Sequence, residues 1–258
     1  MLKNLVLDLE PRITFNHHPN LPSSFRMLII GSSGCSKSCL LPQMLLEPGF
    51  IDYNDLIIFT MTPQQQEYQL LKHGFENNLT KESVASILIN QDQFKGIPIP
   101  QLMKKYAELH NQSGGITVTL TDRINELIPP DKLDKTKKHL IIFDDCITNT
   151  NQKNLSSYFN KGRHNSCNSI YLSQSYFDLD RMIRLNSNVF ILFKLNQRNK
   201  VDVYNSVIGT IMDKQKFYSL TDNTWSKKYQ YIEIIINRDS EKVITDIFGE
   251  PEDSEDDE

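Results

Sequence analysis

The chain has 258 residues, of which 39% are hydrophobic and 23% are charged, a balance typical of an ordinary globular protein. No run of about 18 apolar residues occurs, so neither a membrane span nor a membrane partner is expected. The net charge is -4, but seven acids fall within residues 250–258, and the rest of the chain is mildly basic, with 28 basic and 25 acidic residues.

The domain organisation predicted from these features is a single α/β unit. It covers residues 1–249, with a core at about 25–195 and with C-terminal helices and a strand in 196–249. Residues 250–258 are predicted to form a disordered acidic tail. The tail is either a solubilising end or a partner-binding arm. The N-terminal stretch mixes acids with apolar residues, so we expect an intracellular rather than a secreted protein. The four cysteines form no CxxC pair and are expected to be free buried thiols.

The predicted strands and helices alternate along the chain. Continuous apolar runs predict strands at 25–30, 55–62, 138–145, 168–175, 187–195 and 229–237. Helical patterns separate them at 37–46, 64–75, 99–109, 151–162 and 200–212. Residues 110–137 read as a surface loop, within which ITVTL (116–120) could form a minor strand. This alternation indicates βαβ crossovers and a mainly parallel sheet covered by helices on both faces.

A phosphate-binding motif follows the first strand, in the stretch GSSGCSKS at 31–38. Backbone N–H groups of residues 34–38 would face the phosphates of ATP from a helix N-terminus. Lys37 would neutralise charge on the β- and γ-phosphates, and Ser38 would ligate Mg²⁺. The predicted nucleotide-binding residues are Gly31, Ser32, Ser33, Gly34, Cys35, Ser36, Lys37, Ser38 and Cys39.

Ser36 departs from the motif, which has a second glycine at this position. The loop wraps closely around phosphate, and a side chain there costs about 1–3 kcal/mol if its φ angle is positive. A small serine predicts weaker nucleotide binding rather than its abolition.

Polar residues end two later strands. Asp144 and Asp145 end the run HLIIFDD, and carboxylates at the end of a buried strand are costly without a cation. We therefore predict that Asp144 holds the metal and that Asp145 polarises the attacking water. Gln174 ends the strand NSIYLSQ at the same edge of the sheet and is predicted to sense the γ-phosphate or orient water; a solvated strand cap is the alternative.

Arg163, in NKGRHNS, precedes the strand that ends at Gln174. It is therefore expected at the end of the sheet opposite the chain's own phosphates, where it can serve a neighbour's nucleotide as an arginine finger only within a ring. A surface arginine near a turn is the alternative, and Arg184 is the reserve candidate for the finger.

Four segments together resemble a known family. They are FRMLIIGSSGCSKS, then YNDLIIFT with QQQEYQLL, then DKTKKHLIIFDDC, and finally YFNKGRHNSCNSIYLSQSYF. This combination resembles the viral genome-packaging ATPases of the FtsK-HerA superfamily, above all those of Polinton/Maverick transposons with their poxvirus, adintovirus and virophage relatives. The resemblance covers roughly residues 25 to 195, and its most specific part is the last segment.

The resemblance implies a RecA-like core of the additional-strand class and ATP-driven pumping of double-stranded DNA into a capsid by a homo-oligomeric ring. It implies the same roles for Lys37, Ser38, Asp144, Asp145, Gln174 and Arg163, a capsid protein or vertex as partner, and a location in the host nucleus, cytoplasm or virion. Two alternatives stay open. Ser36, where the family has glycine, favours a non-hydrolysing adaptor at a capsid or on DNA, and the third reading is a general DNA translocase or helicase.

Overall fold

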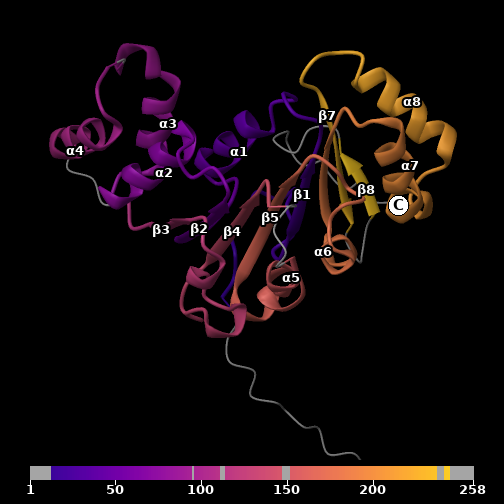
Figure 1. The fold of residues 1–258 in the computed structure, drawn as a ribbon, viewed down its shortest axis with the longest axis horizontal. Helices are drawn as coiled ribbons and strands as arrows, with labels where there is room; N and C mark the ends of the chain where they lie inside the picture. Colours follow the sequence, from indigo (N-terminus) through magenta and orange to yellow (C-terminus); the bar gives the residue numbers. More distant parts are fainter. Residues whose placement is uncertain (1–12, 95, 111–113, 147–151, 237–240, 245–258) are drawn as a thin grey trace, which may run out of the picture.

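The structure is a computed structural model that describes residues 13–94, 96–110, 114–146, 152–236 and 241–244. The expected acidic tail at 250–258 lies outside these residues. Eight strands form one sheet: β1 (Arg26–Ile30), β2 (Asp55–Thr60), β3 (Thr117–Thr121), β4 (His139–Asp144), β5 (Cys167–Ser173), β6 (Val189–Phe193), β7 (Tyr231–Ile236) and β8 (Glu241–Ile244). Their order across the sheet is β3-β2-β4-β5-β1-β6-β7-β8 (Figure 1).

The sheet is parallel from β3 to β6 and antiparallel at β7 and β8. The eight α-helices of the described residues are α1 (Lys37–Leu46), α2 (Gln66–Glu76), α3 (Lys81–Ile89), α4 (Ile99–His110), α5 (Gln152–Lys161), α6 (Arg181–Asn186), α7 (Gln197–Ser206) and α8 (Lys214–Thr224). Because β5 lies between β1 and β4, an additional strand separates the strand before the phosphate motif from the strand that ends at Asp144. The predicted additional-strand class is confirmed.

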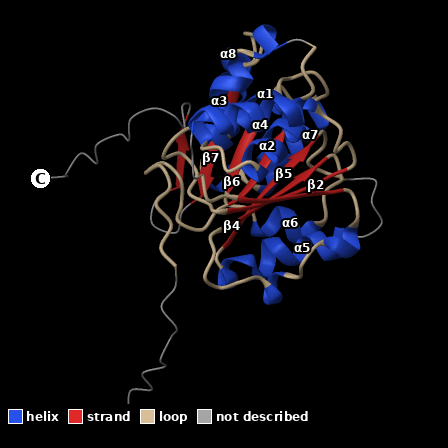
Figure 2. Cartoon of the chain, turned by 90° about the vertical axis from the view of Figure 1, so that its left-hand side faces the viewer, coloured by secondary structure: helices blue, strands red, loops and turns tan. Residues whose placement is uncertain are grey.

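Helices cover both faces of the sheet (Figure 2). Helices α1 to α4 pack on one face against side chains such as Met27, Ile58 and Ile142. On the other face, α5 to α8 contribute to a second core that contains Ile141, Tyr171 and their neighbours. Alternate residues of each central strand therefore enter different cores, which explains why these strands are apolar throughout rather than alternating.

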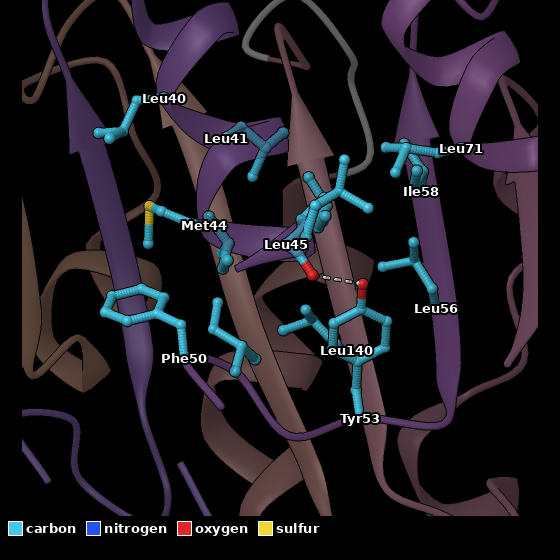
Figure 3. Close-up of a cluster of buried hydrophobic side chains, with 14 of the residues drawn as sticks. Leu40, Leu41, Met44, Leu45, Phe50, Tyr53, Leu56, Ile58, Leu71 and Leu140 are labelled. Carbon is cyan, nitrogen blue, oxygen red and sulfur yellow. Dashed lines mark hydrogen bonds between the residues drawn. The ribbon is translucent and has the colours of Figure 1, made fainter. Parts of the chain in front are cut away.

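Helix α1 is the element that carries the phosphate motif onto the sheet. Its residues Leu41, Met44 and Leu45 are buried on the sheet (Figure 3). Tyr53, in the connection to β2, donates a hydrogen bond from its hydroxyl to the Leu45 carbonyl at 2.9 Å (Figure 3). The C-terminal half of α1 is therefore fixed, which holds its N-terminus at the carboxyl edge of the sheet.

Each strand and helix that the sequence proposed has a counterpart in the structure, but the helix expected at 200–212 is α7, which ends at Ser206 and is followed by a 3₁₀ turn at Ile208–Thr210. ITVTL does form a strand, since β3 pairs with β2 at the edge of the sheet. Helices α3, α6 and α8 and strand β8 match none of the predicted segments; α6 has only six residues, and α8 has few apolar residues among polar ones. The last apolar run, β7, is antiparallel to β6, so the parallel pairing expected for such runs fails there.

Candidate nucleotide-binding site

The phosphate motif lies between the end of β1 and the start of α1. The N–H of Gly31 donates to the Ser173 carbonyl at 3.1 Å, so the loop leaves the sheet beside the end of β5. A Cβ atom on Gly31 would lie 2.6 Å from both Cys35 Sγ and Phe193 Cβ. Only glycine fits this close approach, and the loop is therefore held against β6 as well as β5.

Ser36 is the N-cap of α1 and has φ 76° and ψ 21°, a left-handed conformation. Its side chain makes no capping hydrogen bond, while its carbonyl accepts from the N–H groups of Cys39 and Leu40, each at 3.1 Å. The positive φ that makes glycine preferable at this position is thus present. The serine occupies it at a cost of about 1–2 kcal/mol.

Lys37 folds back over the loop. Its ammonium group donates to the carbonyls of Gly31 and Ser32, the latter at 3.0 Å, and lies 3.7 Å from Cys35 Sγ. Carbonyl oxygens are weaker partners for a cation than phosphate oxygens. The ammonium group is therefore within the loop where an anion would be bound, with partners that an anion can replace.

Asp144 ends β4 and is buried, with 8% of its surface exposed. The Tyr68 hydroxyl donates to its Oδ2 at 2.6 Å. Burial raises the pKa of the Asp144 carboxyl above its usual value, and the neighbouring Asp145 charge adds to this, while Tyr68 and Lys37 oppose it. A buried carboxylate with a raised pKa is stabilised by a cation, so its surroundings favour metal binding.

Asp145 and Gln174 are exposed and lie at the carboxyl ends of the neighbouring strands β4 and β5. A cavity of about 410 Å³ brings them together with the phosphate motif. It is lined by residues 33–39, Gln65, Asp144, Asp145 and 172–174. Residues predicted from three separate strand ends thus share one cavity, which we call the phosphate cavity.

Sequence reasoning missed two residues of this site, Gln65 and Tyr68. Gln65 lines the phosphate cavity and donates from Nε2 to Thr62 Oγ1 at 2.7 Å, and Tyr68 binds Asp144. Both follow β2, whose last residue Thr60 is in register with Asp144. The polar run after DLIIFT contains both residues, but assigning them to the site required knowing that β2 lies beside β4.

The two arginine candidates lie in different places. Arg163 is exposed in the 3₁₀ turn Gly162–Asn165 that precedes β5, where its Nε donates to His164 Nε2 at 3.3 Å. Burial, and then the charge of Arg163, lower the pKa of Arg26 at the start of β1. Arg163 is therefore at the sheet edge opposite the phosphate motif, as its position in the chain predicted.

Arg184, the reserve candidate, lies on α6 in the segment that leads into β6, and its side chain contacts residues of its own chain. Its Nε donates to the Leu179 carbonyl at 3.1 Å, and its guanidinium lies 5.3 Å from the Tyr176 ring centroid. Both partners belong to the connection that follows β5. A half-buried arginine held by its own subunit is a poorer candidate for reaching a neighbour.

The donor set at the phosphate cavity suits Mg²⁺. The Ser38 hydroxyl and the Asp144 carboxylate offer oxygen ligands, and among the described residues no three histidine, cysteine or acidic side chains cluster as a metal site. Mg²⁺ is ordinarily held by one or two protein oxygens together with substrate phosphates and water, so two oxygens suffice. These residues fit the predicted ion.

All four cysteines are free thiols, but only Cys146 and Cys167 are buried. Cys35 is half-buried and Cys39 is exposed, because both belong to the loop and first turn that border the phosphate cavity. The expectation of buried thiols is therefore wrong for these two. None of the helices that the structure describes is both long and apolar enough to span a membrane.

Comparison with known proteins identifies what the chain is similar to. The sequence profile of the family described as Poxvirus A32 protein matches residues 12–247. No curated protein matches the chain in sequence. Among solved structures, the genome packaging NTPase B204 of Sulfolobus turreted icosahedral virus 2, in complex with AMP, aligns with a TM-score of 0.52 at 11% identity, over 86% of this chain and 98% of B204.

A second structure of similar kind is B204, the DNA-packaging ATPase of Sulfolobus Turreted Icosahedral Virus. It aligns with a TM-score of 0.50 at 13% identity, over 84% of this chain and 95% of that one. At such identities the alignments establish the shared fold, which confirms the predicted P-loop α/β architecture. The resemblance to viral packaging ATPases drawn from the sequence motifs is confirmed by the family match.

Proposed function

The chain belongs to the Poxvirus A32 protein family, and from this premise we propose that it is an ATP-hydrolysing motor subunit that packages double-stranded DNA into a viral or virus-like capsid. The observation that carries the proposal is the phosphate cavity, in which Lys37, Ser38, Asp144, Asp145 and Gln174 lie together. Each has the chemistry that one step of phosphoanhydride hydrolysis requires.

Binding of ATP comes first. Residues at the start of α1 line the phosphate cavity, so their N–H groups would attract the β-phosphate, and Lys37 would exchange its carbonyl partners for β- and γ-phosphate oxygens. Ser38 and the ionised Asp144 would hold Mg²⁺, which supplies neutralisation of the charge on those oxygens. The Tyr68 hydroxyl fixes the Asp144 carboxylate for this task.

Hydrolysis follows at the γ-phosphorus. Asp145 accepts a hydrogen bond from the attacking water, and Gln174 orients that water or contacts the γ-phosphate, since both side chains reach the cavity from adjacent strand ends. The bond from the β,γ-bridging oxygen to the γ-phosphorus breaks as water attacks, giving ADP and phosphate. Positioning and electrostatic stabilisation account for most of the catalysis of this reaction class.

The arginine finger is assigned to Arg163. The side chain is exposed and lies at the sheet edge far from its own phosphate motif, so it can approach only a nucleotide bound by another subunit. A homo-oligomeric ring supplies such a neighbour. DNA would pass through this ring, and a capsid protein or vertex would hold the ring at the capsid.

The experiment is a measurement of ATP turnover with and without double-stranded DNA, for the wild-type chain and for Lys37→Ala. We expect DNA-stimulated turnover in the wild type and loss of at least a hundredfold in Lys37→Ala, on the scale of losing one charge-stabilising group. Turnover that Lys37→Ala leaves intact would refute the assignment of this site. Arg163→Ala should lose turnover but keep nucleotide affinity.

A second candidate function is a nucleotide-binding adaptor that does not hydrolyse ATP. The left-handed backbone of Ser36 favours it, since a side chain now stands where a phosphate is approached most closely. Wild-type turnover that is zero, and that appears only in Ser36→Gly, would establish the adaptor. Unwinding of a forked substrate would instead indicate a helicase.

A further inference from the structure

Asn199 is a buried polar residue on α7 that has no part in the mechanism described so far. It is 5% exposed and lies beyond residues 25–195, the part of the chain that carries the resemblance to packaging ATPases. Its Oδ1 atom accepts a hydrogen bond from the Tyr176 N–H at 3.1 Å and another from the Ser175 hydroxyl at 3.4 Å. Asn199 therefore ties α7 to the loop that follows Gln174.

The backbone of Gln174 is bridged by two further hydrogen bonds. The Ser173 hydroxyl donates to the Ser175 carbonyl at 2.6 Å and accepts from the Ser175 N–H at 3.0 Å. Both bonds span Gln174, so they restrict the backbone of the residue between them. The Ser173 carbonyl also accepts from the Gly31 N–H at 3.1 Å. Gln174 is thus carried by a loop that is tied to the phosphate motif before it and to α7 after it.

The end of this loop is anchored on α7 as well. Tyr176 is 2% exposed, and the Arg198 guanidinium lies 4.5 Å from the centroid of the Phe177 ring. Asn199 itself is held in the first turn of α7, because its N–H donates to Asn196 Oδ1 at 2.9 Å. The amide that holds the loop is therefore fixed by the cap of its own helix.

The Gln174 side chain, in contrast, is left free. It is exposed, it lines the phosphate cavity, and it has no hydrogen-bond partner within the part of the chain that the structure describes. A long side chain without partners is placed only by its backbone. Because a misplacement of about 1 Å can cost about a hundredfold in rate, the position of this backbone matters for the reaction.

We propose that Asn199 and Ser173 are positioning residues for Gln174, and that they hold the loop after β5 so that the Gln174 side chain meets the attacking water or the γ-phosphate. Asn199 does not line the phosphate cavity, so it acts through Gln174 rather than on the nucleotide. This inference rests on the proposed role of Gln174, which it deepens by making α7 part of the catalytic apparatus.

The test is a double-mutant cycle on the full chain. ATP turnover with double-stranded DNA is measured for the wild type, Asn199→Ala, Gln174→Ala and the double variant, and the affinity for the ATP analogue AMPPCP is measured by calorimetry. We expect Asn199→Ala to lower kcat by about ten- to a hundredfold and to leave AMPPCP affinity within about twofold of the wild type. In the Gln174→Ala background the same substitution should cost no further turnover, since the residue through which it acts is already absent.

Two controls separate positioning from a general loss of stability. Asn168 is a matched buried asparagine at the other end of β5, 1% exposed, whose Oδ1 accepts from the Phe25 N–H at 2.8 Å. Asn168→Ala should lower Tm as Asn199→Ala does but should leave kcat unchanged. Asn199→Asp keeps an acceptor for the Tyr176 N–H and should recover turnover relative to Asn199→Ala. If Asn199→Ala does not fold, the cycle is run with Ser173→Ala, for which the same result is expected.

An equal loss of kcat in the two backgrounds, or an equal loss in Asn168→Ala, would overturn the proposal, because the effect would then not pass through Gln174. A loss confined to KM and AMPPCP affinity would overturn it too, since nucleotide binding and not positioning would be affected. Failure of the underlying function is recognised differently. In that case Gln174→Ala turns over ATP as fast as the wild type, or the wild type shows no turnover, and the role of Gln174 falls together with that of Asn199.

Discussion

Replacement of Ser36 by glycine is predicted to change both the stability of the folded chain and its affinity for nucleotide. The residue has φ 76°, its side chain makes no capping hydrogen bond, and it borders the phosphate cavity. Glycine adopts this backbone without the steric cost that a Cβ brings. We therefore expect Ser36→Gly to stabilise the folded chain and to tighten nucleotide binding.

Two opposing effects determine the size of the stabilisation. Relief of the left-handed conformation contributes about 1–2 kcal/mol. The greater freedom of glycine in the unfolded chain removes about 0.4–1 kcal/mol of that gain. From the midpoints of these ranges, the net increase in the free energy of unfolding is about 0.8 kcal/mol, which raises Tm by roughly 2–3 °C for a chain of this size.

The assay is thermal unfolding of Ser36→Gly, Ser36→Ala and the wild type, followed by titration with AMPPCP. Ser36→Ala is the matched control, since it keeps Cβ and removes only a hydroxyl that makes no capping bond. It should unfold at the wild-type temperature. Because a β-branched residue is more restricted still, Ser36→Val should lie below the wild type.

The reasoning fails if Ser36→Gly has the same Tm as Ser36→Ala, since the Cβ would then carry no strain. It also fails if Ser36→Gly unfolds at a lower temperature than the wild type. A higher Tm without tighter AMPPCP binding would show that the Cβ of Ser36 affects stability but not nucleotide affinity. The structural argument that Ser36 weakens nucleotide binding would then fail.

Three further predictions concern the same sheet. Gly31→Ala should lower Tm sharply and abolish AMPPCP binding, because its Cβ would overlap the Cβ of Phe193; unchanged unfolding would contradict the 2.6 Å approach. Asp144→Asn should abolish ATP turnover yet raise Tm at pH 7, since burial raises the pKa of this carboxyl and the ionised form is therefore less favourable in the folded state than in the unfolded chain. His17 accepts from the Asp52 N–H at 2.9 Å, and burial lowers its pKa to about 4. The neutral His17 side chain stabilises the folded chain above about pH 6.5, and this contribution is lost as the pH falls towards about 4. The loss in the free energy of unfolding is at most about 3 kcal/mol. Urea unfolding at pH 7 and pH 4.5 should show a smaller difference for His17→Gln than for the wild type.

Several features of the protein could be predicted from the sequence because they depend on neighbours along the chain. The strand before GSSGCSKS, the helix after it and the acids at the end of HLIIFDD are local patterns of hydrophobicity and charge. The carboxyl ends of parallel strands lie at one edge, so Asp144 and Gln174 could be placed beside Lys37 before any coordinates were known. The glycine that the motif expects at Ser36 also indicated that a positive φ angle there would be costly, and the structure supplied the angle itself.

Other features depend on contacts between distant segments, which local patterns do not encode. The register of Thr60 with Asp144 brings Gln65 and Tyr68 into the site. The antiparallel pairing of β7 with β6 brings residues 225–230 to the phosphate motif, nearly 200 positions away along the chain.

The sequence by itself therefore determined the fold class, the phosphate motif and the two aspartates at the end of β4, because each depends on residues that are close together along the chain. Only the tertiary structure decided which strands are neighbours, how deeply Asp144 is buried and what borders the far side of the motif. The physical reason is that strand order and burial arise from the packing of the two cores on opposite faces of the sheet, to which residues from the whole length of the chain contribute.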